Sequence, residues 1–371
     1  MNLDFSDEQK QLKDEARKFL DNESTIARVR SVLNDEKKSF DEELWKSIGA
    51  QGWLGAAIPE EYGGLGLGYL ELCCIAEEIG RAIAPAPFAS TIYFFAEALL
   101  LAGSDAQKKK YLPQIASGEL IGCFAASEAP GALTAASIGA KVEGEKLTGE
   151  KLPVVDGDIA QAAIVLANDG GKPTLFIVDL SGAGVLRETL NTIDPTRSAA
   201  KLTFSAASAE RLGSAGEGVE LVERILDRAA VLIAFEQVGG ADRCLQMARE
   251  YALARYAFGR QIGSYQAIKH RLADMYIKNV LARSNAYYGA WALNTNAPEL
   301  PIAAAGARIS ASEAYWYAAK ENIQTHGGMG FTWEVDCHLY FRRSRQLALI
   351  AGAPRVWKDR LVSQLERRNA A

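Results

Sequence analysis

Two arginines flank a Phe-Gly pair in the segment Arg255-Tyr256-Ala257-Phe258-Gly259-Arg260, which follows a long stretch with helical periodicity. Guanidinium groups beside a turn can hold a phosphate or pyrophosphate, because they donate parallel hydrogen bonds to the anion. Basic residues at the end of a helix also complement the helix dipole without binding a ligand. The segment alone therefore predicts either an anion site or an ordinary helix end.

Adjacent glycines mark a second segment, Gln324-Thr325-His326-Gly327-Gly328-Met329-Gly330. Glycine lacks a Cβ atom, so another backbone or a planar ligand can approach closely. A helix C-terminal cap has a similar pattern, and a lone histidine such as His326 is more often a core residue than a catalyst. The other glycine-rich clusters, 63–68 and 213–218, match neither GxGxxG nor GxxxxGK[ST].

Composition argues against several other kinds of site. The 371 residues carry 41 Lys and Arg against 46 Asp and Glu, so the formal charge of −5 does not favour nucleic acid. Three histidines without HxxxH spacing predict no metal site, and no GxSxG motif anchors a serine hydrolase. Five cysteines without a CxxC pair predict reduced thiols. With neither a signal peptide nor a run of ~18 apolar residues, we expect a cytoplasmic protein without a membrane partner.

The spacing of apolar residues divides the chain into three regions, and the folds of these regions must position the arginine and glycine segments. Residues 1–118 follow helical spacing, residues 119–213 contain short apolar runs typical of strands, and residues 214–371 return to helical spacing. Because no helices interrupt the middle strands, we expect them to pair antiparallel or close into a barrel. The predicted α+β fold has an N-terminal helical domain, a middle antiparallel β-barrel domain and a C-terminal helical bundle domain.

Turn and cap residues locate some elements within these regions. Gly144 predicts a hairpin over 141–148, and the turn at 168–171 predicts a second hairpin. Ser6 to Gln9 offers a cap for the first helix, and Asp105 is the expected cap of a charged helix that ends near residue 118.

Four motifs follow one another in order: PEEYGGLG at 59–66, AEEIGR at 76–81, RYAFGRQIGSYQAIKHRLADM at 255–275 and QTHGGMG at 324–330. Their order and spacing resemble the acyl-CoA dehydrogenase family over essentially the whole chain. The resemblance implies a flavoenzyme that removes a proton from Cα and a hydride from Cβ of an acyl-CoA thioester. FAD takes the hydride, and an electron-transferring flavoprotein takes the electrons.

Members of this family share each FAD between two subunits, and the resemblance divides the site accordingly. One subunit holds the isoalloxazine ring, and its neighbour grips the ADP half. The family's ADP-side residues fall here on Arg255, Phe258, Tyr265, Gln266, Gln324, Gly327 and Gly328.

The isoalloxazine half departs from the family pattern. In the segment 124–131 only Ser127 and Glu128 match clearly, so Ser127 is the one cofactor contact carried over there. The family's flavin-stacking aromatic residue aligns with Pro153, and the hydroxyl residue that follows it aligns with Val155.

The general base is also missing. The family's glutamate falls on Ala351 or, in members such as isovaleryl-CoA dehydrogenase, on Ala229. A methyl group cannot take a proton, and loss of a general base typically costs ~10²–10⁴-fold in rate. Asp227 and Arg228 fall where the family contacts acyl-CoA.

Three hypotheses follow from this asymmetry. The leading one is the base-lacking subunit of an α₂β₂ enzyme of the bacterial steroid side-chain type, which lends the ADP side of an FAD to a second acyl-CoA dehydrogenase subunit. The second is a self-sufficient homotetramer in which Glu236, seven residues after Ala229, acts as a relocated base. The third, from another class, is a redox-inactive protein that binds or scaffolds CoA thioesters.

Overall fold

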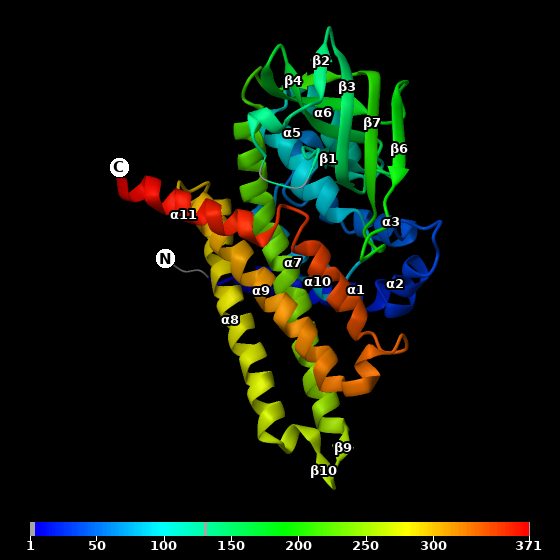
Figure 1. Cartoon of the computed structure of the whole chain (residues 1–371), viewed down its shortest axis with the longest axis vertical. Coiled ribbons are helices and arrows are strands. Elements are labelled where there is room, and N and C mark those ends of the chain that lie inside the picture. The colour runs from blue at the N-terminus through cyan, green and yellow to red at the C-terminus, as the bar shows by residue number, and fades with distance from the viewer. Residues whose placement is uncertain (1–3, 130, 132, 371) are drawn as a thin grey trace. The chain divides into compact units, whose positions relative to one another are not determined.

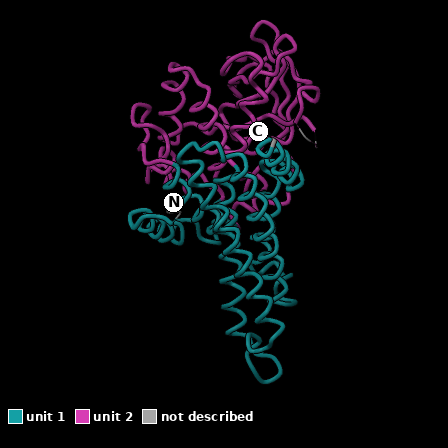
Figure 2. Tube along the Cα trace, turned by 90° about the vertical axis from the view of Figure 1, so that its left-hand side faces the viewer, with its two compact units in different colours: residues 1–29, 69–84, 230–371 teal, residues 30–68, 85–229 magenta. Residues whose placement is uncertain are grey.

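The computed structural model describes residues 4–129, 131 and 133–370 (Figure 1). The chain divides into two compact units, each assembled from separate stretches of sequence (Figure 2). Unit 1 comprises Met1–Val29, Tyr69–Ala84 and Ala230–Ala371, and unit 2 comprises Arg30–Gly68 and Pro85–Ala229. Across the described residues, no helix combines the length and the apolar character needed to cross a membrane.

Unit 1 is helical. Its elements are α1 (Asp7–Glu23), α4 (Tyr69–Arg81), most of α7 (Gly218–Ala254), β9 (Tyr256–Ala257), β10 (Arg260–Gln261), η5 (Ile262–Ser264), α8 (Gln266–Asn294), α9 (Leu300–His326), η6 (Gly327–Phe331), α10 (Cys337–Leu347) and α11 (Pro354–Ala370). The predicted cap of the first helix is confirmed, because Ser6 Oγ accepts from Gln9 N and Gln9 Oε1 accepts from Ser6 N. Helices α8 and α9 run side by side (Figure 1).

Helices α4 and α7 pack with their backbones in contact. A Cβ atom added to Gly80 would lie 2.0 Å from the carbonyl oxygen of Glu236, and one added to Gly239 would lie 1.9 Å from that of Glu77. Only glycine permits such an approach. The Glu77 carboxylate of α4 also forms ion pairs with Lys13 Nζ of α1 at 2.7 Å and with Arg283 Nη1 of α8 at 2.8 Å. One carboxylate therefore connects three helices.

Unit 2 combines helices with a sheet. Its elements are the later part of α2 (Ile26–Leu33), α3 (Glu42–Ala50), η1 (Trp53–Gly55), η2 (Glu60–Tyr62), the π-helix η3 (Ala89–Ala96), α5 (Glu97–Ala102), α6 (Asp105–Ala116), β1 (Gly122–Ala125), η4 (Ala135–Ser137), β2 (Lys141–Glu143), β3 (Lys146–Val155), β4 (Ala162–Asp169), β5 (Lys172–Asp179), β6 (Val185–Thr189), β7 (Ala199–Ser208), β8 (Glu210–Leu212) and the start of α7.

One predicted cap was wrong by a residue. Helix α6 begins at Asp105, but Ser104 is its cap, and the Ser104 Oγ atom accepts from the backbone N–H of Gln107 at 3.2 Å. Both serine and aspartate serve at this position, so the sequence alone did not separate them.

The two predicted hairpins are confirmed. Strands β2 and β3 pair antiparallel around Gly144 and Glu145, which both have positive φ angles, and β4 pairs antiparallel with β5 around Gly170 and Gly171. Turns with two positive φ angles follow the right-handed twist of the flanking strands.

The prediction of an antiparallel β-barrel was wrong. The strand order is β6-β7-β3-β2-β4-β5-β8, and β4 also pairs with β1. Strands β1 and β2 both run parallel to β4, so the sheet is mixed. Among the described strands, β6 and β8 end the sheet and do not pair with each other, so it is open. The β2–β3 hairpin lies between β1 and β4 in sequence and takes the place of the crossover helix that parallel strands usually need.

Candidate functional site

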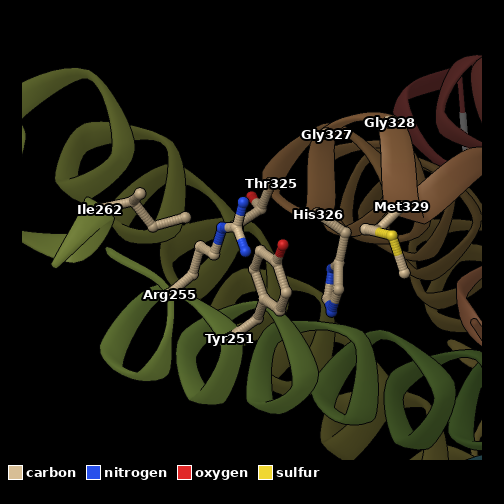
Figure 3. A pocket seen from close by; sticks show the side chains of 8 residues that line it. All are labelled: Tyr251, Arg255, Ile262, Thr325, His326, Gly327, Gly328 and Met329. Carbon is tan, nitrogen blue, oxygen red and sulfur yellow. The ribbon is translucent and has the colours of Figure 1, made fainter. Parts of the chain in front are cut away.

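A cavity of about 480 Å³ lies in unit 1, where α7 and α9 end. Its lining residues are Tyr251, Arg255, Ile262, Thr325, His326, Gly327, Gly328 and Met329. Figure 3 shows the side chains of Tyr251, in the last turn of α7, and Arg255, directly after that helix, extending toward those of Thr325 and His326, with Ile262 at one end and Met329 at the other. The two segments singled out by sequence therefore meet at one place.

The end of α7 is shaped by a tight hairpin. Phe258 and Gly259 have φ angles of 54° and 78°, and they connect β9 to β10 as the two central residues of the turn. The hydroxyl of Tyr265 donates to the carbonyl of Ala257 at 2.9 Å, and the guanidinium of Arg260 lies 4.0 Å from the centre of the Tyr265 ring. These contacts brace the hairpin while the Phe258 side chain remains 95% exposed.

Glycines open the opposite wall. Helix α9 ends at His326, and Gly327 follows with a φ angle of 61°, which a side chain would disfavour. Cβ atoms added at Gly327 or Gly328 would meet nothing within 4 Å. A ligand can therefore approach the backbone directly at these two residues.

His326 and Tyr251 form a stacked pair within the cavity. Their ring centres lie 4.2 Å apart with an angle of 28° between the planes. The Nδ1 atom of His326 lies 2.8 Å from the carbonyl oxygen of Asn322, and the Thr325 hydroxyl donates to the carbonyl of Glu321 at 2.7 Å. The Arg255 side chain is exposed directly after α7, so the cavity offers a cation beside an aromatic surface.

Of the predicted ADP-side residues, the structure brings three together in this cavity: Arg255, Gly327 and Gly328. Gln324 is exposed on α9, about one turn before Gly327 and Gly328. Phe258 lies in the adjoining β9–β10 hairpin, and Tyr265 and Gln266 lie at the start of α8.

Sequence reasoning did not assign Tyr251, Ile262, Thr325, His326 or Met329 to a binding site. One signal was available, because Tyr251 lies one helical turn before Arg255, in the last turn of α7.

The residues aligned with the isoalloxazine half lie in unit 2, on β3 and the loop after β1. Pro153 is exposed, Val154 is buried and Asp156 accepts a hydrogen bond from Ser90 Oγ at 2.6 Å. The hydroxyl of Ser127 donates to the carbonyl of Ala129 at 3.2 Å. Neither an aromatic ring nor a hydroxyl group is present at Pro153 or Val155, so this strand end lacks the two groups that the resemblance calls for.

Glu128 instead supports the local fold. Its carboxylate accepts from the buried Lys151 ammonium at 2.6 Å and from the backbone N–H groups of Gly139 and Ala140 at 2.7 and 3.0 Å. Burial alone raises the pKa of Glu128, but the hydrogen bonds from Lys151 and the backbone outweigh it and lower the pKa. Burial also lowers the pKa of Lys151, against the opposing effect of Glu128.

Both alanines at the family's base positions are buried. Ala229 in α7 is 0% exposed, and Ala351, in the turn after α10, is 3% exposed. The carbonyl of Ala351 accepts from Trp357 Nε1 at 2.9 Å.

The candidate base and the candidate substrate contacts are also enclosed. Glu236 is 0% exposed on α7, where its backbone faces Gly80. Asp227 is buried, and Arg228 forms a buried ion pair with Glu97 of α5. The guanidinium of Arg228 is therefore used inside unit 2.

Comparison with known proteins adds to these observations. Residues 6–119 match the acyl-CoA dehydrogenase N-terminal domain, and residues 216–365 match the acyl-CoA dehydrogenase C-terminal domain. The chain belongs to the acyl-CoA dehydrogenase family. Acyl-CoA dehydrogenases are oxidoreductases that use FAD.

Several acyl-CoA dehydrogenases are similar to this chain over nearly its full length. Acyl-CoA dehydrogenase IpdE2 of Mycobacterium tuberculosis is 37% identical over 344 residues, which cover 91% of each chain. A chain of the ChsE4-ChsE5 complex from the same organism has a TM-score of 0.88 at 28% identity, with 99% of each chain covered. A chain of a single-residue variant of the Tcur3481-Tcur3483 steroid ACAD has a TM-score of 0.87 at 29% identity and covers 98% of this chain and 99% of that chain.

The two halves of the site fit FAD differently. The cavity in unit 1 offers a guanidinium group and a glycine pair over which a Cβ would find open space, and these features suit a diphosphate. The end of β3 offers Pro153 and Val155 to the flavin ring, which gives neither stacking nor a hydrogen bond from a hydroxyl group. The chain therefore suits the ADP half of FAD and not its ring.

Proposed function

We propose that this chain is the non-catalytic subunit of an α₂β₂ acyl-CoA dehydrogenase. It contributes the ADP side of an FAD site shared with a second acyl-CoA dehydrogenase subunit, which carries the glutamate base and the flavin bed. One observation carries the proposal: Arg255, Gly327 and Gly328 of the ADP side line one open cavity, whereas alanine occupies both base positions, 229 and 351.

In this assembly the chain binds and orients the cofactor. Arg255 neutralises the diphosphate, Gly327 and Gly328 let it approach the backbone, and Phe258 projects from the braced hairpin as an aromatic contact. The remaining residues of this side are Tyr265, Gln266 and Gln324, with Ser127 on the loop after β1. FAD, when bound, supplies the hydride acceptor for α,β-dehydrogenation of the acyl-CoA.

Proton removal from the acyl-CoA belongs to the partner in this proposal. The methyl groups of Ala229 and Ala351 cannot accept a proton, and Glu236 is enclosed between helices of unit 1. Asp227 and Arg228 remain substrate contacts only by family position, since Arg228 is already paired with Glu97. The electrons leave to an electron-transferring flavoprotein, as in the family.

The relatives support both the assembly and a class of substrate. One similar chain comes from a complex of two named components, ChsE4 and ChsE5, and another comes from a steroid acyl-CoA dehydrogenase. We infer that the acyl group here is likewise bulky and steroid-derived, and that the enzyme is cytoplasmic. The matched family domains, 6–119 and 216–365, support our proposed division into residues 1–118, 119–213 and 214–371.

The deciding experiment is to purify the chain alone and to record its visible spectrum, its FAD-to-protein ratio and its mass in native mass spectrometry. We expect a product with little flavin and no dehydrogenase turnover. Co-expression with an acyl-CoA dehydrogenase subunit that carries the glutamate is expected to give a yellow, active heterotetramer. A homotetramer that is saturated with FAD and active on its own would contradict the proposal.

A further inference from the structure

We propose that the outward face of α8 binds the same face of a second copy of this chain. The two helices run antiparallel, and a two-fold axis passes between Val280 and Leu281 of each copy. The inference goes beyond the proposed function, because it concerns how the two copies of this chain in an α₂β₂ enzyme meet. It does not depend on where FAD is held.

The outward face of α8 is a stripe of exposed, uncharged residues at helical spacing: Ala273, Tyr276, Ile277, Val280, Leu281 and Ser284. The four large side chains of this stripe are between 43% and 61% exposed. A helix at a protein surface normally presents polar and charged residues to solvent. An exposed apolar stripe that covers several turns therefore indicates a binding surface.

Charged residues of α8 lie beside the stripe and contact other helices of unit 1. The Lys278 ammonium lies 5.1 Å from the centre of the Tyr317 ring of α9. The Arg283 guanidinium pairs with Glu77 of α4 at 2.8 Å. The opposite face of α8, which includes Met275, is buried. The stripe is thus apolar along its centre, and the charges at its sides are used inside unit 1.

A second copy of the chain suits such a surface. In a two-fold contact the same patch serves on both subunits, so a charged patch would meet its own charge. The stripe carries no charged residue, and it can face itself without repulsion. A lipid surface would instead favour basic residues that are free to reach it from the sides of the stripe. Lys278 and Arg283 already have partners within the chain.

Antiparallel pairing about the proposed axis matches large residues with small ones. Residues at equal distances on opposite sides of the axis face each other, so Ile277 faces Ser284 of the second copy. In the same register Ala273 faces the half-buried Tyr288 of the second copy, one to two turns farther out. Facing positions that alternate in size interdigitate well. The residues next to the axis meet their own counterparts.

Cysteine cross-linking of the full chain tests this register. The native cysteines are all buried, so the wild-type chain serves as the blank. Leu281→Cys should give a disulfide-linked dimer under mild oxidation, because the two copies of this position are offset by only about 1.5 Å along the helices. Ala273→Cys is the matched control. Its two copies lie about 22 Å apart along the helices, so it should not cross-link.

Sedimentation velocity measures the strength of the contact. We expect the wild-type chain alone to form a dimer at micromolar concentration. Leu281→Glu should weaken self-association by at least about 100-fold, because two carboxylates meet at the axis. An equal mixture of Leu281→Glu and Leu281→Lys chains should restore the dimer. Val362→Glu changes a residue of α11 that is 55% exposed, and it should leave the dimer unchanged. Circular dichroism checks that each variant folds.

Several outcomes would refute the inference. One is a monomeric wild-type chain whose Leu281→Cys variant also fails to cross-link in the enzyme assembled with its second subunit. Cross-linking of Ala273→Cys would refute the antiparallel register. If Leu281→Glu releases the second subunit but leaves self-association unchanged, the stripe belongs to that subunit and the inference fails.

The same experiments separate this inference from the proposed function. A homotetramer that is saturated with FAD, active alone and cross-linked at position 281 would refute the proposed function and support the α8 contact. A flavin-poor chain that becomes active only with a second subunit, and that does not cross-link at position 281 in that enzyme, would support the proposed function and refute the α8 contact.

Discussion

The cavity in unit 1 and the end of β3 in unit 2 correspond to the two halves of one cofactor site in the family, yet they differ in what their side chains do. Around the cavity, polar and aromatic groups remain exposed, with Arg255 and Phe258 facing solvent. At the end of β3, Asp156 is hydrogen-bonded to Ser90, and Glu128 is bonded to Lys151. The first region leaves these side chains exposed, and the second pairs its polar side chains within the chain.

This difference fits the proposed division of the cofactor site between two subunits. At β3 the resemblance calls for an aromatic ring and a hydroxyl group, and Pro153 and Val155 supply neither, while the polar neighbours Asp156 and Glu128 are hydrogen-bonded within unit 2. In the cavity, Thr325 and His326 are hydrogen-bonded within α9, and the Arg255 side chain is exposed. Substitutions in the two regions should therefore alter different measurable quantities.

Glu128→Gln should have the largest effect, and it should be an effect on stability. It leaves the buried Lys151 ammonium without a charged partner, which we expect to cost about 3 kcal/mol of unfolding free energy. Urea unfolding followed by circular dichroism measures this loss. The lowered pKa of Glu128 means that its contribution is present above the usual value of 4.5 and is lost as the pH falls through the folded-state pKa below it.

The matched control for Glu128 is Glu150→Gln. Glu150 pairs with Lys201 at 2.8 Å on the surface of the same sheet, where its loss should cost less than about 1 kcal/mol. Equal losses in the two variants would show that the Glu128 pair is no more important to unit 2 than a surface pair.

Arg255→Ala should have the next largest effect, and it should leave stability unchanged. Loss of a charged hydrogen-bond donor to the diphosphate corresponds to about 1.5–3 kcal/mol, or roughly 10- to 100-fold weaker retention of FAD in the assembled enzyme. The FAD-to-protein ratio after gel filtration measures it. Arg249→Ala, an exposed arginine earlier on α7, is the control. An unchanged FAD-to-protein ratio in the Arg255 variant would show that the unit 1 cavity does not hold the diphosphate through Arg255.

Glu236→Gln should have the smallest effect. The carboxylate is buried beside the α4–α7 contact, so we expect turnover of the assembled enzyme to change by no more than a few-fold. Steady-state kinetics with an acyl-CoA substrate tests this. A loss of ~10²–10⁴-fold would instead identify Glu236 as a relocated base and would support a self-sufficient enzyme.

Local chemistry made part of this structure predictable. The capping box at Ser6 and the turn at Gly144 depend on neighbouring residues, and both are present as expected. Arg255, Gly327 and Gly328 were recognised from their motifs, and they meet in one cavity.

Long-range pairing was not predictable from the same information. Nothing in the short apolar runs shows that β1 pairs parallel with β4 across the β2–β3 hairpin. Helical spacing also did not distinguish the π-helix η3 from an α-helix. His326 is buried, as expected of a core residue, but the sequence did not show that it stacks on Tyr251, which lies on another helix 75 positions away.

The glycine contact between α4 and α7 constrains how this sequence can evolve. Gly80 and Gly239 allow the close contact because they have no Cβ atom. A side chain at either position would meet the backbone of the other helix and would separate the two helices. A lost side-chain contact can be replaced by a new one nearby, but the close approach of two backbones cannot be restored once a Cβ atom lies between them. Among descendants of this chain, these two positions should therefore stay glycine.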